Sequence, residues 1–213
     1  MSRRILCDDG ALWSLRLFRR DIDPRRLLRA PDRIFQRHSR LAFADGICIK
    51  KILPQKPADY LRRPVRSQAK REALSTMVMQ EMGIKVPVIY GYGINISPFN
   101  KYESILFMEN ILNIGTVKNF LISCSDENKR SKVLASVLND INTFLKYNQR
   151  HKDAHFGNIL LLHNLETVWI DNDVKKISSV EDRENFLRKF INNNLLSEKE
   201  KQIFIKNIKG IKT

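Results

Sequence analysis

Polar residues at a fixed spacing, between a long amphipathic segment and two short apolar runs, constrain this chain more than any other feature. Residues 151–158 read HKDAHFGN, which places a histidine, an aspartate and an asparagine in the pattern H-x-D-x-x-x-x-N. The apolar runs NILLL and TVWID follow, and their short separation predicts a β-hairpin that ends in Asp171, with Asp173 two residues on. Such a hairpin folds the chain back, so we expect Asn158 and Asp171 to lie on the same side of it.

The chain around and beyond this segment has the periodicity of helices. Apolar residues recur at helical spacing in residues 125–149, and TVKNFLIS before them predicts a shorter helix. Two more amphipathic helices are expected at residues 181–190 and 197–208, the second with a capping box formed by Ser197 and Glu200. Residues after 110 should therefore be mainly helical.

The preceding residues have the pattern of strands instead. RIFQ and RLAFADGICIKKIL predict three strands, with Asp45-Gly46 closing a tight hairpin between the second and the third. SQAKREALSTMVMQEMG predicts a helix that begins after Ser67 and ends at Gly83. PVIYGYGI and YESILFME add two strands, so the order β-β-β-α-β-β predicts a curled sheet that carries one helix.

The H-x-D-x-x-x-x-N segment with Asp171 resembles the catalytic loop and the metal-binding strand end of kinases. The resemblance implies that Asp153 orients the acceptor hydroxyl as a base and that Asn158 and Asp171 hold Mg²⁺. Asp173 would be a spare metal ligand, and His151 would brace the loop from beneath.

The same resemblance implies a fold class and a division of the chain. We expect a bilobal, protein-kinase-like α+β fold. Residues 1–109 would form an N-lobe with a basic N-terminal segment and a five-stranded antiparallel sheet with one helix. Residues 110–213 would form a small, mainly helical C-lobe that contains the catalytic loop.

Lys50 resembles the strand lysine that reaches the nucleotide phosphates, and Glu72 resembles its partner on the helix. Lys51 is the rival of Lys50, because side chains alternate along a strand and only one of the two can face the nucleotide. Glu81 is a weaker rival of Glu72, because it lies close to the helix end. Backbone groups around Met108 and Asn110, after the fifth strand, would meet the adenine.

One part of the kinase pattern is missing, namely the glycine-rich loop over the phosphates. Gln36-Arg37-His38-Ser39-Arg40 stands between the first two strands instead. Arg37, Ser39 and Arg40 would contact phosphates by side chain rather than by backbone amides, although a plain basic hairpin tip is an alternative.

His155, two residues after Asp153, and the sequence I-D-x-D in place of D-F-G are similar to small-molecule kinases of this superfamily. Too little chain follows Asp171 for the segments that dock a protein substrate. From Arg33 to Lys189 the chain is most similar to the bacterial lipopolysaccharide kinases that phosphorylate Kdo or heptose. This resemblance implies transfer of a phosphoryl group from ATP, with Mg²⁺, to a sugar hydroxyl of a lipid-linked saccharide, and His155 as part of the catalytic loop.

Composition adds an expectation about partners. The 38 Lys and Arg residues exceed the 23 Asp and Glu residues, for a formal net charge of +15, which favours an anionic partner. The first thirty residues combine eight arginines with apolar residues, a mixture suited to an anionic membrane surface: Arg3, Arg4, Arg16, Arg19, Arg20, Arg25, Arg26 and Arg29 with Trp13, Leu15, Leu17 and Phe18. Alternatively, the apolar residues pack on the first lobe. No apolar stretch is long enough for a signal or a span, so we expect a cytoplasmic protein, peripheral on the inner face of the membrane.

Three alternatives remain open. A compact protein kinase or an aminoglycoside-type phosphotransferase shares the D-x-x-x-x-N and I-D-x-D geometry. A pseudokinase module would keep the fold without phosphoryl transfer, as the missing glycine loop allows. A nucleic-acid-binding protein is not expected, because aromatic residues are only 8% and do not interleave with Lys and Arg.

Overall fold

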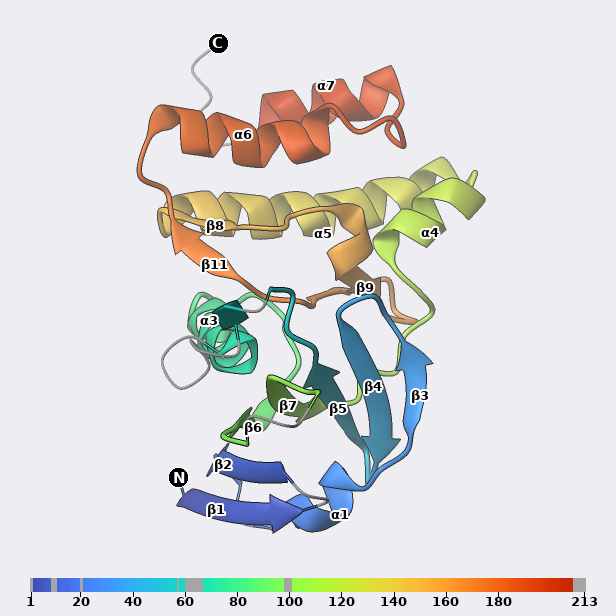
Figure 1. Cartoon of the computed structure of the whole chain (residues 1–213). Helices are drawn as coiled ribbons and strands as arrows, with labels where there is room; N and C mark the ends of the chain where they lie inside the picture. Colours follow the sequence, from blue (N-terminus) through green and yellow to red (C-terminus); the bar gives the residue numbers. More distant parts are fainter. Residues whose placement is uncertain are drawn as a thin grey trace. The chain divides into compact units, whose positions relative to one another are not determined.

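The structure, a computed structural model, describes residues 2–8, 11–19, 21–56, 58–59, 67–97 and 101–208 (Figure 1). The chain forms two compact units, Met1–Met77 with Pro87–Ile111, and Val78–Val86 with Leu112–Thr213. Residues 78–86, which the predicted boundary after residue 109 gives to the N-lobe, thus group with the second unit. The assignment of the units as kinase lobes stays a prediction.

Seven antiparallel strands form the sheet of the first unit, in the order β1-β2-β6-β7-β5-β4-β3 (Figure 1). Their bounds are Ser2–Asp8 (β1), Ala11–Leu17 (β2), Asp32–Phe35 (β3), Ser39–Ala44 (β4), Ile47–Ile52 (β5), Ile89–Asn95 (β6) and Ser104–Glu109 (β7). The β4–β5 hairpin turns at Asp45 and Gly46, which both have positive φ, as predicted for the Asp-Gly pair.

The prediction of a five-stranded sheet is wrong, because the first thirty residues fold onto it. They form the β1–β2 hairpin and the helix α1 (Pro24–Leu28), and β2 pairs with β6. Alternation in β2 buries Trp13, Leu15 and Leu17 at 4% exposure or less. These three side chains are therefore core residues and not membrane contacts, and Arg20 lies outside the described residues.

The helix α3 (Gln68–Glu81) begins and ends as its sequence predicts. The hydroxyl of Ser67 accepts a hydrogen bond from the N–H of Lys70 at 3.3 Å, and Gly83 adopts a φ of +82° after the last turn. Its buried residues Ala69 and Ala73 pack on the sheet with Ile52, Leu106 and Tyr92.

Helices and two small sheets make up the second unit. The helices are α4 (Val117–Ser123), α5 (Glu127–Lys146), α6 (Val180–Ile191) and α7 (Glu198–Asn207), and α7 has the predicted capping box. The predicted hairpin is the sheet of β9 (Ile159–Leu161) and β10 (Thr167–Trp169), while the sheet of β8 (Gln149–His151) and β11 (Val174–Lys176) was not predicted. Figure 1 shows α6 and α7 on one side of α5.

The core of this unit is aromatic. Phe144 of α5 contacts Trp169 and Phe186 edge to face, at ring-centroid distances of 5.2 and 5.6 Å. This packing fixes the end of β10, after which Asp171 follows. In the part of the chain that the structure describes, no helix is long and apolar enough to cross a membrane.

Candidate active site

Lys50 and Glu72 form a buried ion pair in the first unit. The Lys50 Nζ lies 2.9 and 2.8 Å from the two carboxylate oxygens of Glu72, and the two side chains are 6% and 7% exposed. Lys50 is on the face of β5 that carries α3, together with Cys48 and Ile52, so β5 and α3 bring the two charges together. A buried pair of this kind is costly to desolvate and needs two well-placed partners.

Lys51 points to the opposite face of the sheet. Its Nζ lies 2.8 Å from Asp32 Oδ1 and donates to the carbonyl of Ala30 at 2.9 Å. Of the two candidate lysines, Lys50 is therefore the one that pairs with Glu72, while Glu81 is exposed in the last residue of α3. Whether Lys50 binds a nucleotide stays a prediction.

The β3–β4 hairpin contains residues 36–40, which replace the glycine-rich loop of the kinase pattern. The hydroxyl of Ser39 donates to Gln36 Oε1 at 2.5 Å, and Ser39 is buried. Arg40 donates to the carbonyls of Gln36 and Ser39 and covers the ring of Phe35 at 5.1 Å. Ser39 and Arg40 thus tie the hairpin together, which does not favour them as phosphate ligands, and Arg37 remains as an exposed cation near the tip.

Met108 and Asn110 lie at the end of β7. Met108 pairs with Cys48 and with Ile89 across the sheet. The N–H of Asn110 donates to the carbonyl of Gly46 at 3.1 Å. This N–H is therefore already hydrogen-bonded within the protein. The prediction that backbone groups here contact adenine then depends on the other N–H and C=O groups near Met108 and Asn110.

Asp153, His155 and Asn158 come together in the second unit. The Asn158 side-chain amide donates to the Asp153 carbonyl at 2.9 Å and to Asp153 Oδ2 at 3.3 Å. His155 Nε2 lies 3.6 Å from the same Oδ2, while its Nδ1 accepts the N–H of Gly157 at 3.0 Å. Neutral His155 therefore carries its proton on Nε2, facing Asp153. The Asp153 side chain is 72% exposed, so its carboxylate is open to a substrate.

His151 lies beneath this loop. It is 1% exposed and packs between Phe144 and Trp169, at centroid distances of 6.4 and 5.3 Å. Burial lowers the pKa of His151 to about 4, and neither of its ring nitrogens has a hydrogen-bond partner among the described residues. His151 is thus a neutral group held by packing, and no hydrogen bond of its ring supports the prediction that it braces the loop by hydrogen bonding.

Asp171 has an unusual backbone. Its φ of +55° lies in the left-handed region, which is uncommon for residues other than glycine, although aspartate adopts it more often than most. The N–H of Ile170 donates to the carbonyl of Asn158 at 3.0 Å, which holds the chain before Asp171 against the end of the segment 151–158. Asp173 lies 3.4 Å from the Lys152 Nζ, and its carbonyl accepts the Lys152 N–H at 2.8 Å.

The donor set fits magnesium in its chemistry. The Asn158 nitrogen is used by Asp153, so its carbonyl oxygen Oδ1 is left as a neutral hard ligand, and Asp171 supplies a carboxylate. No group of three His, Cys, Asp or Glu side chains that could hold a metal exists among the described residues. A metal at this site would therefore need the asparagine and the oxygens of a substrate as well.

Sequence reasoning missed two supports of the site. Lys189 of α6 donates to the carbonyl of Lys152 at 2.6 Å, next to Asp153. Asp140 of α5 accepts from Trp169 Nε1 at 2.8 Å and from Thr167 at 3.2 Å, which fixes β10. Burial raises the pKa of Asp140 to about 6. Neither residue is marked by any motif, although Asp140 is a polar residue in an amphipathic helix.

By sequence alone, no protein family and no curated protein matches the chain. Solved structures are similar to it. WaaP in complex with acyl carrier protein has a TM-score of 0.63 at 13% identity, over 87% of this chain and 82% of that chain. WbdD with the kinase inhibitor LY294002 has a TM-score of 0.56 at 18% identity, over 79% of this chain and 38% of that chain. Monomeric WbdD has a TM-score of 0.56 at 16% identity, over 79% and 40%, so the chain spans less than half of WbdD. The chain therefore shares its fold with WaaP and with part of WbdD.

Proposed function

We propose that this chain is a kinase that transfers the γ-phosphoryl group of ATP to a sugar hydroxyl of the lipopolysaccharide inner core, on Kdo or heptose. The observation that carries the proposal is the loop in which Asn158 and His155 surround an exposed Asp153 carboxylate, followed by Asp171 in its left-handed conformation. The shared fold with WaaP and with WbdD, which has been solved with a kinase inhibitor, supports it.

The chemistry follows from the positions of the side chains. Asp153 Oδ2 accepts the hydrogen bond of the acceptor hydroxyl and takes its proton as the oxygen attacks the γ-phosphorus. The bond from the γ-phosphorus to the bridging oxygen breaks, and ADP leaves with that electron pair. Asn158 and His155 keep the carboxylate oriented, because both approach the same Oδ2.

The remaining proposed site residues bind the nucleotide. Lys50, held by Glu72, would contact its phosphates, and the exposed Arg37 would add a second cation. Asn158 Oδ1 and Asp171, with Asp173 in reserve, would hold Mg²⁺, which when bound neutralises the charge that develops on the phosphates.

The proposed location rests on charge alone. Arg3, Arg4, Arg25 and Arg26 are exposed, and the net charge of +15 favours an anionic surface. We propose that these arginines hold the protein on the inner face of the cytoplasmic membrane, where a lipid-linked saccharide acceptor would be found.

Nucleotide binding is the first test. Thermal unfolding is measured with ATP and Mg²⁺ and with ATP and EDTA, on the wild type, on Asp171→Ala, and on Glu184→Ala, whose exposed ion pair with Arg188 contributes little. Stabilisation by roughly 2.7 kcal/mol is expected at 100 times the Kd. It should need both the metal and Asp171, and the Glu184 variant should behave as the wild type. Absence of any shift at millimolar nucleotide would contradict a kinase and favour the pseudokinase alternative.

Phosphoryl transfer is the second test. Labelled ATP is incubated with Kdo-containing lipid A and with heptosylated core, using the wild type and Asp153→Asn. The variant should bind nucleotide as before and lose about 10²–10⁴-fold in kcat, because only the proton acceptor is removed. If an aminoglycoside or a protein is phosphorylated and neither saccharide is, the proposed acceptor is wrong, while the proposed kinase activity is confirmed.

A further inference from the structure

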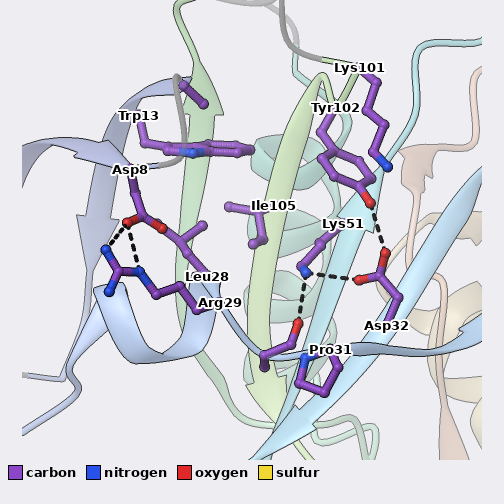
Figure 2. Close-up of a pocket in the computed structure, with 12 residues that line it drawn as sticks. Asp8, Trp13, Leu28, Arg29, Pro31, Asp32, Lys51, Lys101, Tyr102 and Ile105 are labelled. Carbon is purple, nitrogen blue, oxygen red and sulfur yellow. Dashed lines mark hydrogen bonds and ion pairs between the residues drawn. The ribbon is translucent and has the colours of Figure 1, made fainter.

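A polar pocket lies on the sheet face opposite to Lys50 and α3. Its volume is about 640 Å³, within the range of small-molecule sites. Figure 2 shows two groups of charged side chains that face each other across Ile105 of β7. The β1–β2 hairpin, the end of α1 and the segment after it supply more than half of the lining residues: Asp8, Ala11, Trp13, Leu28, Arg29, Ala30 and Pro31.

One side of the pocket is built around Lys51. Its Nζ donates to the carbonyl of Ala30 at 2.9 Å and forms an ion pair with Asp32 Oδ1 at 2.8 Å, and an ammonium group has three N–H donors in all. The hydroxyl of Tyr102 donates to the other oxygen of Asp32 at 2.8 Å. Burial and Asp32 raise the pKa of Tyr102 to about 12, so it stays a neutral donor. Lys51 is nine-tenths buried and held ready to donate to a ligand oxygen.

The other side combines a buried acid with an aromatic wall. Asp8 is 4% exposed in its side chain and accepts from Arg29 Nε and Nη2 at 3.0 and 2.8 Å through Oδ1. Trp13 stands above it in Figure 2. The carboxylate of Asp8 has further lone pairs for hydroxyl donors, and a ring such as that of Trp13 packs well on an apolar C–H surface.

The charge of the pocket favours an anion. Arg29 and Lys51 are matched by Asp8 and Asp32, and Lys101 is a further cation. The Lys101 Nζ lies 5.0 Å from the centre of the Tyr102 ring and forms no ion pair with any residue of the described ranges. A ligand therefore meets an excess positive charge, several hydroxyl acceptors and an aromatic wall. The many charged groups disfavour a purely apolar occupant.

We propose that this pocket binds an acidic saccharide, a sugar that carries a phosphate or a carboxylate. Its acidic group pairs with Lys101 and with the ammonium group of Lys51. Its hydroxyls donate to Asp8 and Asp32, and its C–H face packs on Trp13. The proposal does not rest on phosphoryl transfer, because Lys51 and Lys50 face opposite sides of the sheet.

Calorimetric titration of the full chain tests it with glucose 6-phosphate, glucuronate, glucose and inorganic phosphate. At least one of the two acidic sugars should bind about tenfold more tightly than both glucose and inorganic phosphate. Glucose lacks the charge-assisted contacts of the acidic group, and inorganic phosphate lacks the contacts of the sugar hydroxyls. Whichever acidic sugar binds more tightly shows whether the pocket prefers a phosphate or a carboxylate. If inorganic phosphate binds as tightly as the acidic sugars, the pocket does not recognise a saccharide. If neither acidic sugar binds at a concentration of about 10 mM, the pocket is not a binding site for this class of ligand.

Variants locate the binding. Lys101→Glu should weaken it by at least about tenfold. Lys56→Glu, the same charge reversal at an exposed residue that does not line the pocket, should leave it unchanged. Leu28→Trp should fill the pocket and also weaken binding, with thermal unfolding to confirm that each variant folds. A saturating ATP–Mg²⁺ mixture should not compete. Competition, or equal weakening by the Lys56 variant, would place the ligand elsewhere.

Discussion

Lys50 and Lys51 are neighbours in sequence, but Lys50 pairs with Glu72 of α3 and Lys51 pairs with Asp32 on the opposite face of the sheet. Alternation along a strand predicts that they face opposite sides, and the sequence also predicts a helix with Glu72 nearby. It does not tell which face of β5 the helix covers, because that depends on the packing of Ala69 and Ala73 against Ile52 and Leu106. The choice between the two lysines is thus a tertiary property.

Lys50→Met should lower the free energy of unfolding by about 3–5 kcal/mol, because it removes the cation that neutralises Glu72. The double variant Lys50→Met/Glu72→Met should recover much of this loss, since both charges are replaced by apolar groups. Neither should show stabilisation by ATP and Mg²⁺. Urea unfolding with and without nucleotide measures both effects.

Lys51→Met is the matched comparison. It breaks the pair with Asp32 and should also destabilise the chain, yet it should keep the nucleotide response, because Lys51 lies on the other face. A response that is lost in Lys51→Met and kept in the double variant would contradict the assignment of Lys50.

Elements with caps or a clear apolar pattern were predictable, and short polar ones were not. The helices α5, α6 and α7 follow their apolar periodicity, and α7 also its capping box. The strands β8 and β11 have three residues each and are mostly polar, whereas the equally short β9 and β10 are apolar runs that the sequence showed. In β2 the alternation was present, but the arginines of the first thirty residues left a membrane surface open as an alternative to packing on the first lobe.

Asp140→Asn tests how α5 holds β10 as a function of pH. The pKa of Asp140 is raised from 3.8 to about 6, so the folded state binds this proton more tightly than the unfolded state. Its contribution to stability is full below about pH 4 and is lost as pH rises through about 6, by at most about 3 kcal/mol. Asparagine keeps the acceptor for Trp169 without the charge. The variant should therefore gain stability relative to the wild type as pH rises from about 4 to 7, in urea unfolding at each pH. A constant difference would contradict the raised pKa.

Arg130 joins three elements of the second unit. It forms a two-pronged pair with Glu200 of α7 at 2.8 and 2.9 Å and donates to the carbonyls of Leu121 and Leu195 at 2.6 and 2.9 Å. Arg130→Met should cost about 2–4 kcal/mol in urea unfolding, because these acceptors lose their donors. Arg188→Met, which breaks an exposed pair with Glu184, should cost less than about 0.5 kcal/mol. Similar costs for the two variants would show that the Arg130 contacts contribute little.

At the scale of the whole molecule, the sequence predicted most of the elements on either side of residues 151–158, because their patterns are local, and the catalytic role of that segment stays a prediction. The sequence did not predict that the first thirty residues extend the sheet, or that they line a pocket with residues of β5 and β7. Both depend on the pairing of β2 with β6, whose residues lie more than seventy positions away. Long-range pairing of this kind leaves no local signal in one sequence.

Net charge leads to a prediction at the same scale. The protein should sediment with vesicles that contain phosphatidylglycerol and not with neutral ones, and salt should release it. Arg3→Glu/Arg4→Glu should weaken the binding by more than about tenfold, at about 1 kcal/mol for each basic residue lost. Lys129→Glu/Lys132→Glu changes the total charge equally on α5 and should have a smaller effect. Equal effects would show that no particular surface faces the lipid.

Residues 78–86 give the second unit part of its core long before the rest of that core exists. Met79, Met82, Ile84 and Val86 pack with side chains from α4 to α7. On the ribosome these residues emerge first and must wait while more than a hundred further residues are made, which takes on the order of ten seconds. During translation the end of α3 is thus an apolar surface without its partners, and a chaperone that binds nascent chains would be expected to meet the protein there.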